Sequence, residues 1–284
     1  MTTLADLAEL VRAPAALSVP GDVIAGAAAA GALSPRTPAL AGASVLLYWA
    51  GMAANDWADR RLDAEERPER PIPSGRVTPA AAVGLAAGLT AAGVGLAAAV
   101  GGRRAAALAV PLAATIWGYD LLAKNTAAGP AVMAACRGLD VLLGASGGRM
   151  TRALPAAATI AAHTWTVTAL SRREVTGADA TLPMRTLAGT AVVAASAAVA
   201  APRRVAVLPA VLAGWYAARY GAAQAEVVRD PSAGRVRAAV GAGITGLPAL
   251  QGALTARGGA GLLGVAVAAA APLGRRLARK VSPT

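Results

Sequence analysis

Three aspartates at the end of an apolar run have the spacing of a cation-binding helix face. Asp56, Asp59 and Asp63 are spaced i, i+3 and i+7, so on a helix their carboxylates project from one face and lie close to one another. Like charges this close repel each other. Hard divalent cations such as Mg²⁺ relieve that repulsion and leave coordination positions for phosphate oxygens and water. The spacing therefore predicts a site for a metal-diphosphate complex, and the alternative is a solvated acidic helix end.

The segment after the aspartates supplies candidate phosphate ligands. Arg67 and Arg70 alternate with Pro68, Pro71 and Pro73, and these prolines predict a stiff, extended connection that returns both arginines over the carboxylates. A guanidinium group presents a planar fork of donors that matches phosphate oxygens. The sequence thus predicts a diphosphate clamp between carboxylates and arginines, unless the arginines only mark a cytoplasmic loop.

The elements that must hold these side chains are apolar helices. The chain has 284 residues, 56% of them hydrophobic and 15% charged, with a mean hydropathy of +0.53. A soluble domain could hardly bury this much apolar surface, and the absence of Phe suits membrane helices that meet through small side chains. Uncharged runs long enough to cross a bilayer predict an all-α bundle of nine or ten transmembrane helices in one domain, residues 1–284. The candidate runs lie near 15–33, 38–56, 78–100, 104–122, 127–146, 153–171, 184–201, 204–221, 236–254 and 258–275.

The distribution of charge predicts which end of the bundle faces the cytoplasm. If the N-terminus is cytoplasmic, the two long connections at 57–77 and 222–235 share its side, which then holds about twice as many Lys and Arg residues as the other side. None of the 15 acidic residues falls in a proposed outer hairpin. The aspartates would then face the cytoplasm from the cell membrane. A nucleic-acid partner is disfavoured, because no soluble basic domain remains outside the spans.

The motif around the aspartates resembles that of a known family. The pattern N-D-x-x-D-x-x-x-D begins at Asn55 and is followed by R-P-I-P-S-G from Arg70. It resembles the UbiA superfamily of membrane prenyltransferases, in particular the EboC-like branch, and the resemblance continues through 119–124 and 137–144. It implies a helix bundle around a central cavity open to the cytoplasm. It also implies Mg²⁺-dependent transfer of an isoprenyl group from a prenyl diphosphate, within the lipid bilayer, to an aromatic or other small hydroxyl or ring acceptor.

The resemblance also implies roles for individual residues. Lys124 follows Asp120 by four residues and would contact the diphosphate, although an Asp-Lys helix pair explains the spacing equally well. The catalytic residues would be Asp56, Asp59, Asp63 and Lys124. The metal would be held by Asp56, Asp59, Asp63, Glu174 and Asp179, and the diphosphate by Asn55, Arg67, Arg70, Lys124 and Arg172.

The second acidic motif departs from the family pattern, which is usually D-x-x-x-D. Asp179 lies five residues after Glu174, off its helical face unless the helix ends at Gly177 and the chain turns back. This departure leaves open a second hypothesis, a UbiA-like lipid-handling or transport protein that binds prenyl diphosphate without turnover. A CDP-alcohol phosphotransferase is excluded, because its D-G-x-x-A-R element is absent.

Several polar residues fall inside the apolar runs. Arg137 and Asp140 are three residues apart, and pairing between them would explain how charges are tolerated there. Asp22 marks a break in the first run, whose freed carbonyls must face protein or water. His163 and Trp165 could line an acceptor pocket, but a lone intramembrane His is more often a hydrogen-bond partner between helices.

Overall fold

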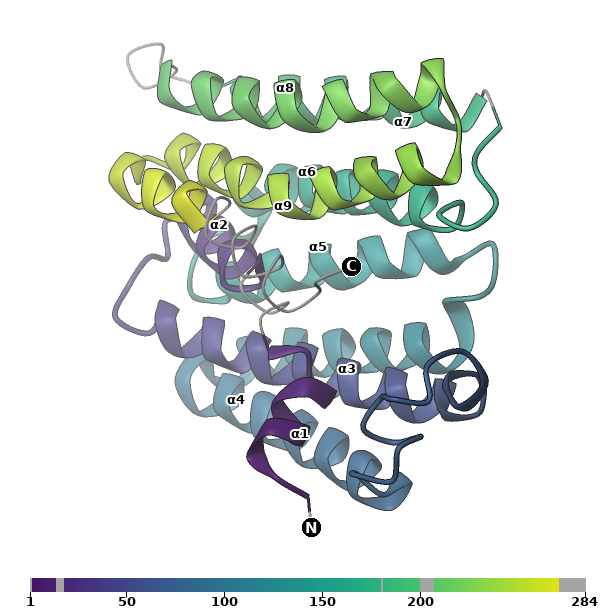
Figure 1. Cartoon of the computed structure of the whole chain (residues 1–284). Helices are drawn as coiled ribbons and strands as arrows, with labels where there is room; N and C mark the ends of the chain where they lie inside the picture. The colour runs from purple at the N-terminus through teal and green to yellow at the C-terminus, as the bar shows by residue number, and fades with distance from the viewer. Residues whose placement is uncertain (1, 14–17, 180, 200–206, 271–284) are drawn as a thin grey trace.

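The computed structural model describes residues 2–13, 18–179, 181–199 and 207–270, and within these ranges the chain is helical without strands. Parts of four predicted spans, at 15–17, 200–201, 204–206 and 271–275, lie outside the described residues. The helices, shown in Figure 1, are α1 (Leu4–Leu10), α2 (Pro20–Ala30), α3 (Thr37–Glu66), α4 (Pro79–Gly118), a π-helix (Tyr119–Ala123), α5 (Gly129–Gly144), a 3₁₀ turn (Ala145–Gly147), α6 (Met150–Ser171), α7 (Thr181–Ala198), α8 (Val207–Arg229), α9 (Ala233–Arg257) and a last helix, Gly261–Ala270.

The all-helical prediction is confirmed, and a helix coincides with each predicted run. Two runs share α4, which is interrupted at Gly102, where φ is 65° and ψ is −159°. A glycine is needed there, because an L side chain is strained at positive φ. By length and composition, two of the described helices could each cross a membrane, Thr37–Glu66 and the combined Pro79–Ala123.

The helices lie side by side as a bundle in Figure 1, with α7 and α8 at one edge and α3 and α4 at the other. One hydrophobic cluster joins α6, α7, α8 and α9, and a second joins α2, α3, α4 and α5. Small residues bring the helices into close contact. A Cβ on Gly26 of α2 would lie 1.8 Å from the Val141 carbonyl oxygen of α5. Helices α2 and α5 are therefore packed backbone to backbone, as the small-residue composition predicts.

Helix α3 continues well beyond its apolar run and ends at Glu66. The three aspartates therefore lie on its last turns, as their spacing predicts. The predicted extended connection after them is wrong, because 67–78 folds as consecutive turns. Backbone bonds of 3.0 Å from Ser74 to the Arg70 carbonyl and 2.9 Å from Val77 to the Pro71 carbonyl close these turns. Burial of Ile72 and Val77 against α3 and α4 stabilises the folded loop.

Candidate active site

The aspartates of α3 form a cluster of ion pairs with basic residues from three other segments. Arg70 Nη1 lies 2.7 Å from Asp63 Oδ2 and 3.5 Å from Asp56 Oδ1. Arg67 is more distant from Asp63, at 3.9 Å. Asp56 and Asp63 are almost fully buried, so a cation next to each is required. The folded loop thus brings both predicted arginines to the aspartates by turns rather than by an extended chain.

Arg12, at the end of α1, provides a cation that the sequence analysis did not assign. Its Nη2 lies 2.7 Å from Asp56 Oδ1, and its backbone has φ 46°, a strained value for a residue with a side chain. Such strain persists only where the surrounding structure holds it. Local spacing could not predict this contact, because Arg12 and Asp56 are 44 residues apart in the sequence.

Helix α1 is held in place by an ion-pair cluster on the loop after α3. Arg76 Nη1 lies 2.8 Å from Asp6 Oδ1 and 2.7 Å from Glu9 Oε2. Hydrogen bonds from Thr3, together with Arg76, lower the pKa of Asp6 to about 2, and the bonds to Glu9 and Asp6 raise the pKa of Arg76. Both groups therefore stay charged at neutral pH, which keeps α1 and Arg12 beside the aspartates.

Lys124 reaches the cluster from the far side, through the π-helix. The Lys124 amide donates to the Tyr119 carbonyl over 2.9 Å, an i to i+5 bond. Its Nζ lies 2.7 Å from Asp59 Oδ1, while Asn55 Nδ2 donates to Asp120 Oδ1 over 3.0 Å. Lys124 is therefore paired with Asp59, and the proposed pair with Asp120 is not what the structure shows. π-Helical turns are frequent at functional sites.

The charges of this cluster balance, and that balance bears on metal binding. Four carboxylates, Asp56, Asp59, Asp63 and Asp120, lie with four cations, Arg12, Arg67, Arg70 and Lys124. In the described part of the chain no three His, Cys, Asp or Glu side chains come together closely enough to hold a metal ion by themselves. Mg²⁺ needs only one or two carboxylates when phosphate oxygens complete its shell. The donor set thus fits a metal that arrives with a diphosphate.

The residues of the second acidic motif, Glu174 and Asp179, have hydrogen-bond partners outside the aspartate cluster. Helix α6 ends at Ser171, before Gly177, and leaves Glu174 in a turn. Arg237 Nη1 donates to the Glu174 carbonyl over 2.8 Å, and burial raises the pKa of Glu174 although Arg237 opposes the shift. Asp179 Oδ1 accepts from the amides of Thr181 and Leu182, both at 2.9 Å, at the start of α7. These bonds lower the pKa of Asp179 and show a helix-capping role for it.

Arg172 also has an observed partner outside the aspartate cluster. Its Nη1 donates to the carbonyl of Thr126, in the loop that follows Lys124. The bond ties the end of α6 to the loop that carries Lys124. The predicted contact of Arg172 with a diphosphate stays a prediction.

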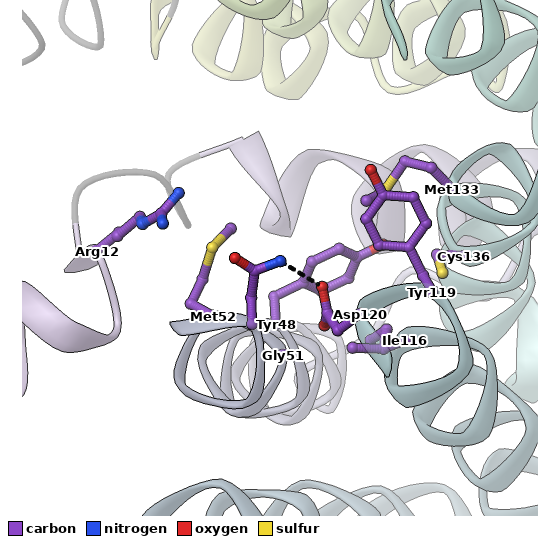
Figure 2. Close-up of a pocket in the computed structure, with 10 residues that line it drawn as sticks. Arg12, Tyr48, Gly51, Met52, Ile116, Tyr119, Asp120, Met133 and Cys136 are labelled. Atoms are coloured by element: carbon purple, nitrogen blue, oxygen red, sulfur yellow. Dashed lines mark hydrogen bonds between the residues drawn. The ribbon is translucent and has the colours of Figure 1, made fainter. Parts of the chain in front are cut away.

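A cavity of about 220 Å³ opens beside the cluster, between α3, α5 and the π-helix. Figure 2 shows Arg12 on one side of it and Tyr119 and Met133 on the other, with Asp120 between them. Its lining combines polar side chains, among them Arg12, Asn55 and Asp120, with apolar ones such as Met52, Ile116 and Met133. This arrangement suits a molecule with an anionic head and an apolar body.

The intramembrane charges are paired, but not as the sequence spacing predicts. Arg137 Nε lies 2.7 Å from Asp22 Oδ2, whereas Asp140 is hydrogen-bonded to Ser44. The Ser18 carbonyl, freed by the break before α2, accepts bonds from Arg137 and from Gln251. The expected Arg137–Asp140 pair is therefore replaced by partners on other helices. The break is satisfied by protein, as predicted.

A helical bundle with an aspartate and arginine cluster at a helix end is the arrangement that the sequence resemblance implies for a membrane prenyltransferase. Residues 18–225, most of the chain, match the UbiA prenyltransferase family. The chain belongs to the UbiA prenyltransferase family, and the resemblance seen in the sequence is confirmed.

Curated relatives and solved structures agree with this assignment. The digeranylgeranylglyceryl phosphate synthase of Natronomonas pharaonis is 44% identical over 85 residues, 29% of this chain and 31% of the relative. That of Methanothrix thermoacetophila is 42% identical over 80 residues, 27% of this chain and 30% of the relative. The matched segment thus spans about a third of each relative.

Two solved structures share the fold. One, described as giving structural and mechanistic insights into digeranylgeranylglyceryl phosphate synthase in membranes, has a TM-score of 0.64 and 16% identity and covers 86% of this chain and 98% of its own. The apo structure of a UbiA homolog from Aeropyrum pernix K1 has a TM-score of 0.60 and 19% identity, and covers 88% of this chain and 96% of its own. At these identities the likeness concerns the fold alone.

Proposed function

We propose that this protein is a Mg²⁺-dependent integral-membrane prenyltransferase that takes its isoprenyl group from a prenyl diphosphate. The observation that carries the proposal is the charge-balanced cluster at the end of α3, next to a cavity lined by both polar and apolar side chains. A cluster with no surplus charge does not attract a diphosphate alone. It can take up the anion together with divalent cations, because carboxylates bind the metal while the freed cations bind phosphate oxygens.

The acidic side chains of the cluster are the proposed metal ligands. Asp56, Asp59 and Asp63 are the proposed metal ligands, and Glu174 is the proposed ligand from the second motif. The metal, when bound with the diphosphate, supplies Lewis-acid stabilisation of the leaving group. Asp179 is the weakest of the predicted ligands, because its carboxylate already caps α7.

The basic and amide side chains orient the diphosphate. Arg12, Arg70 and Lys124 lie within 3.5 Å of the aspartates, so each can exchange a carboxylate for a phosphate oxygen with a small side-chain movement. Arg67 and Asn55 lie at the border of the cluster, and Arg172 is the proposed contact nearest the Lys124 loop. Positioned charges of this kind stabilise the charge that develops on a departing diphosphate.

The relatives named digeranylgeranylglyceryl phosphate synthase favour an acceptor that carries a hydroxyl group. For this chain we propose only the class of acceptor, a small molecule with a hydroxyl group, and not the particular product for which the relatives are named. The whole chain, residues 1–284, is proposed to act as one domain in the cell membrane, with its N-terminus and the aspartate cluster facing the cytoplasm.

The test is a turnover assay on purified protein with Mg²⁺, prenyl diphosphates of several lengths and glyceryl phosphate, in the presence and absence of a cell extract. Pyrophosphate and prenylated products are measured. We expect Mg²⁺-dependent release of pyrophosphate, and its loss in the double variant Asp56→Ala, Asp59→Ala.

A matched control removes an acidic charge away from the cluster. Asp230 pairs with Arg235 at 3.6 Å on the surface, so Asp230→Ala should leave turnover unchanged. Binding of a prenyl diphosphate without pyrophosphate release from any donor would overturn the enzyme proposal in favour of a lipid-handling protein. Full activity in the double variant would overturn the assignment of the site.

A further inference from the structure

A second, larger cavity of about 330 Å³ lies next to the first. Tyr48, Met52, Tyr119 and Met133 line both cavities, so the two adjoin through these side chains. The larger cavity continues between α6 and α9, away from the aspartates. It therefore offers space for a second molecule beside a bound diphosphate.

The two main walls of this cavity differ in chemistry. On α6 the lining includes Thr164, Thr168 and Ser171, spaced i, i+4 and i+7, which places three hydroxyl groups on one helix face over roughly 10 Å. On α9, three apolar residues with the same spacing also line the cavity: Val240, Ile244 and Leu247. The cavity thus has a hydroxyl wall on α6 and an apolar wall on α9.

The hydroxyl wall remains available to a ligand although its groups bond to their own helix. Thr164 Oγ1 donates to the Ile160 carbonyl over 2.9 Å, and Ser171 Oγ to the Thr168 carbonyl over 3.0 Å. A hydroxyl that donates in this way keeps two acceptor lone pairs. A ligand hydroxyl can therefore donate to this wall without breaking any bond of the helix.

His163 supplies the donor that this wall lacks. The residue is 2% exposed, lines the larger cavity, and has its Nδ1 2.8 Å from the Tyr216 hydroxyl. We assign Tyr216 as the donor of this bond, since a phenol donates readily to an imidazole nitrogen, and this assignment places the ring proton on Nε2. Within the described residues Nε2 has no hydrogen-bond partner, and it is not among the polar atoms enclosed by packing.

A donor that reaches a cavity and has no protein partner is free to bond to a ligand there. Tyr216 and Tyr220 pack edge-on against the imidazole, with ring centroids at 5.3 and 5.5 Å. They hold the ring in place at the cavity lining, with Nδ1 on the Tyr216 hydroxyl.

We propose that the α6 wall binds the acceptor of the reaction, a small molecule with several hydroxyl groups along one edge of an apolar body, and that His163 Nε2 is its specificity-determining donor. Calling the bound molecule the acceptor rests on the proposed function, whereas the existence of the binding site does not. The apolar body lies against α9, and its hydroxyl groups lie against α6. His163 recognises an oxygen at the inner end of the acceptor.

The test measures binding without turnover. Purified protein in lipid nanodiscs is titrated calorimetrically with octane-1,2-diol and with its dimethyl ether, which cannot donate hydrogen bonds, and empty nanodiscs provide the baseline. We expect the diol to bind more tightly than the ether. His163→Asn keeps a partner for Tyr216 but withdraws the group at Nε2, and it should weaken diol binding about three- to tenfold, the effect of one lost hydrogen bond.

Two further variants separate recognition from folding. His163→Gln places an amide nitrogen near the Nε2 position and should restore diol binding. Thr245→Val removes a hydroxyl of α9 that bonds to its own helix outside the cavity and should change nothing. No loss of diol binding in His163→Asn overturns the proposal. Diol binding no tighter than that of the ether also overturns it, because the ether oxygens accept from Nε2 but cannot donate to the hydroxyl wall.

A last measurement distinguishes this proposal from the proposed function. Geranyl thiodiphosphate, a non-hydrolysable donor analogue, is titrated against the same variants with Mg²⁺. We expect its affinity to be the same in wild type and His163→Asn. A weaker affinity in the variant would show that the α6 wall belongs to the prenyl donor and would overturn the acceptor assignment. Diol binding through His163 in a protein that releases no pyrophosphate would refute the enzyme and leave this binding site intact.

Discussion

The ion pair between Asp59 and Lys124 offers a quantitative test of how the cluster works. The two charged atoms are 2.7 Å apart, and the side chains are 26% and 14% exposed. At an effective dielectric constant of about 20 the attraction between them is about 6 kcal/mol. Desolvation and partial exposure reduce the net coupling to about 1–3 kcal/mol. We expect Asp59→Asn and Lys124→Met each to lower the free energy of unfolding, and the double variant to cost little more than either.

The assay is a double-mutant cycle with two readouts. Reversible denaturant unfolding in mixed micelles measures the stability coupling, and pyrophosphate release measures kcat/KM for the prenyl diphosphate. If Lys124 also contacts the diphosphate, Lys124→Met lowers kcat/KM even when Asp59→Asn is already present. A stability coupling below about 0.5 kcal/mol would refute the ion pair as a stabilising interaction. Unchanged kcat/KM in that background would show that Lys124 only neutralises Asp59.

Three other outcomes follow from the packing and charges. Arg70→Gln should destabilise the protein by about 2–3 kcal/mol in denaturant unfolding, because Asp63 stays buried with only a distant cation, whereas the exposed Arg61→Gln should not. Gly26→Val should cost about 3 kcal/mol or more, seen as a lower thermal midpoint, since its Cβ would overlap a carbonyl of α5. The lowered pKa of Asp6 means that its contribution to α1 docking is complete above about pH 4 and is lost as pH falls towards 2. Hydrogen exchange of α1 amides should follow that titration and should lose it in Asp6→Asn.

Local sequence was sufficient for much of the fold. Uncharged runs of membrane-spanning length predict where the helices lie, and the spacing of Asp56, Asp59 and Asp63 predicts that they share a face of α3. Both inferences rest on helical periodicity, which neighbouring residues determine. The prolines after α3 were less informative. Fixed φ angles permit turns as well as extended chain, and burial of Ile72 and Val77 selects the turns.

Local sequence did not predict which charged residues pair with one another. Arg12 contacts Asp56 across 44 residues of sequence, and Arg137 pairs with Asp22 on another helix instead of with Asp140 on its own. Which charges meet depends on how α1, α2, α3 and α5 pack, and that packing is decided by contacts such as Gly26 against α5. The His163 cavity wall arises in the same way, from α6 and α9 brought together at one cavity. The sequence by itself determined the helices and the family, because these depend on local pattern and motif. The tertiary structure decided the ion pairs and cavities, because they form between side chains that only packing brings together.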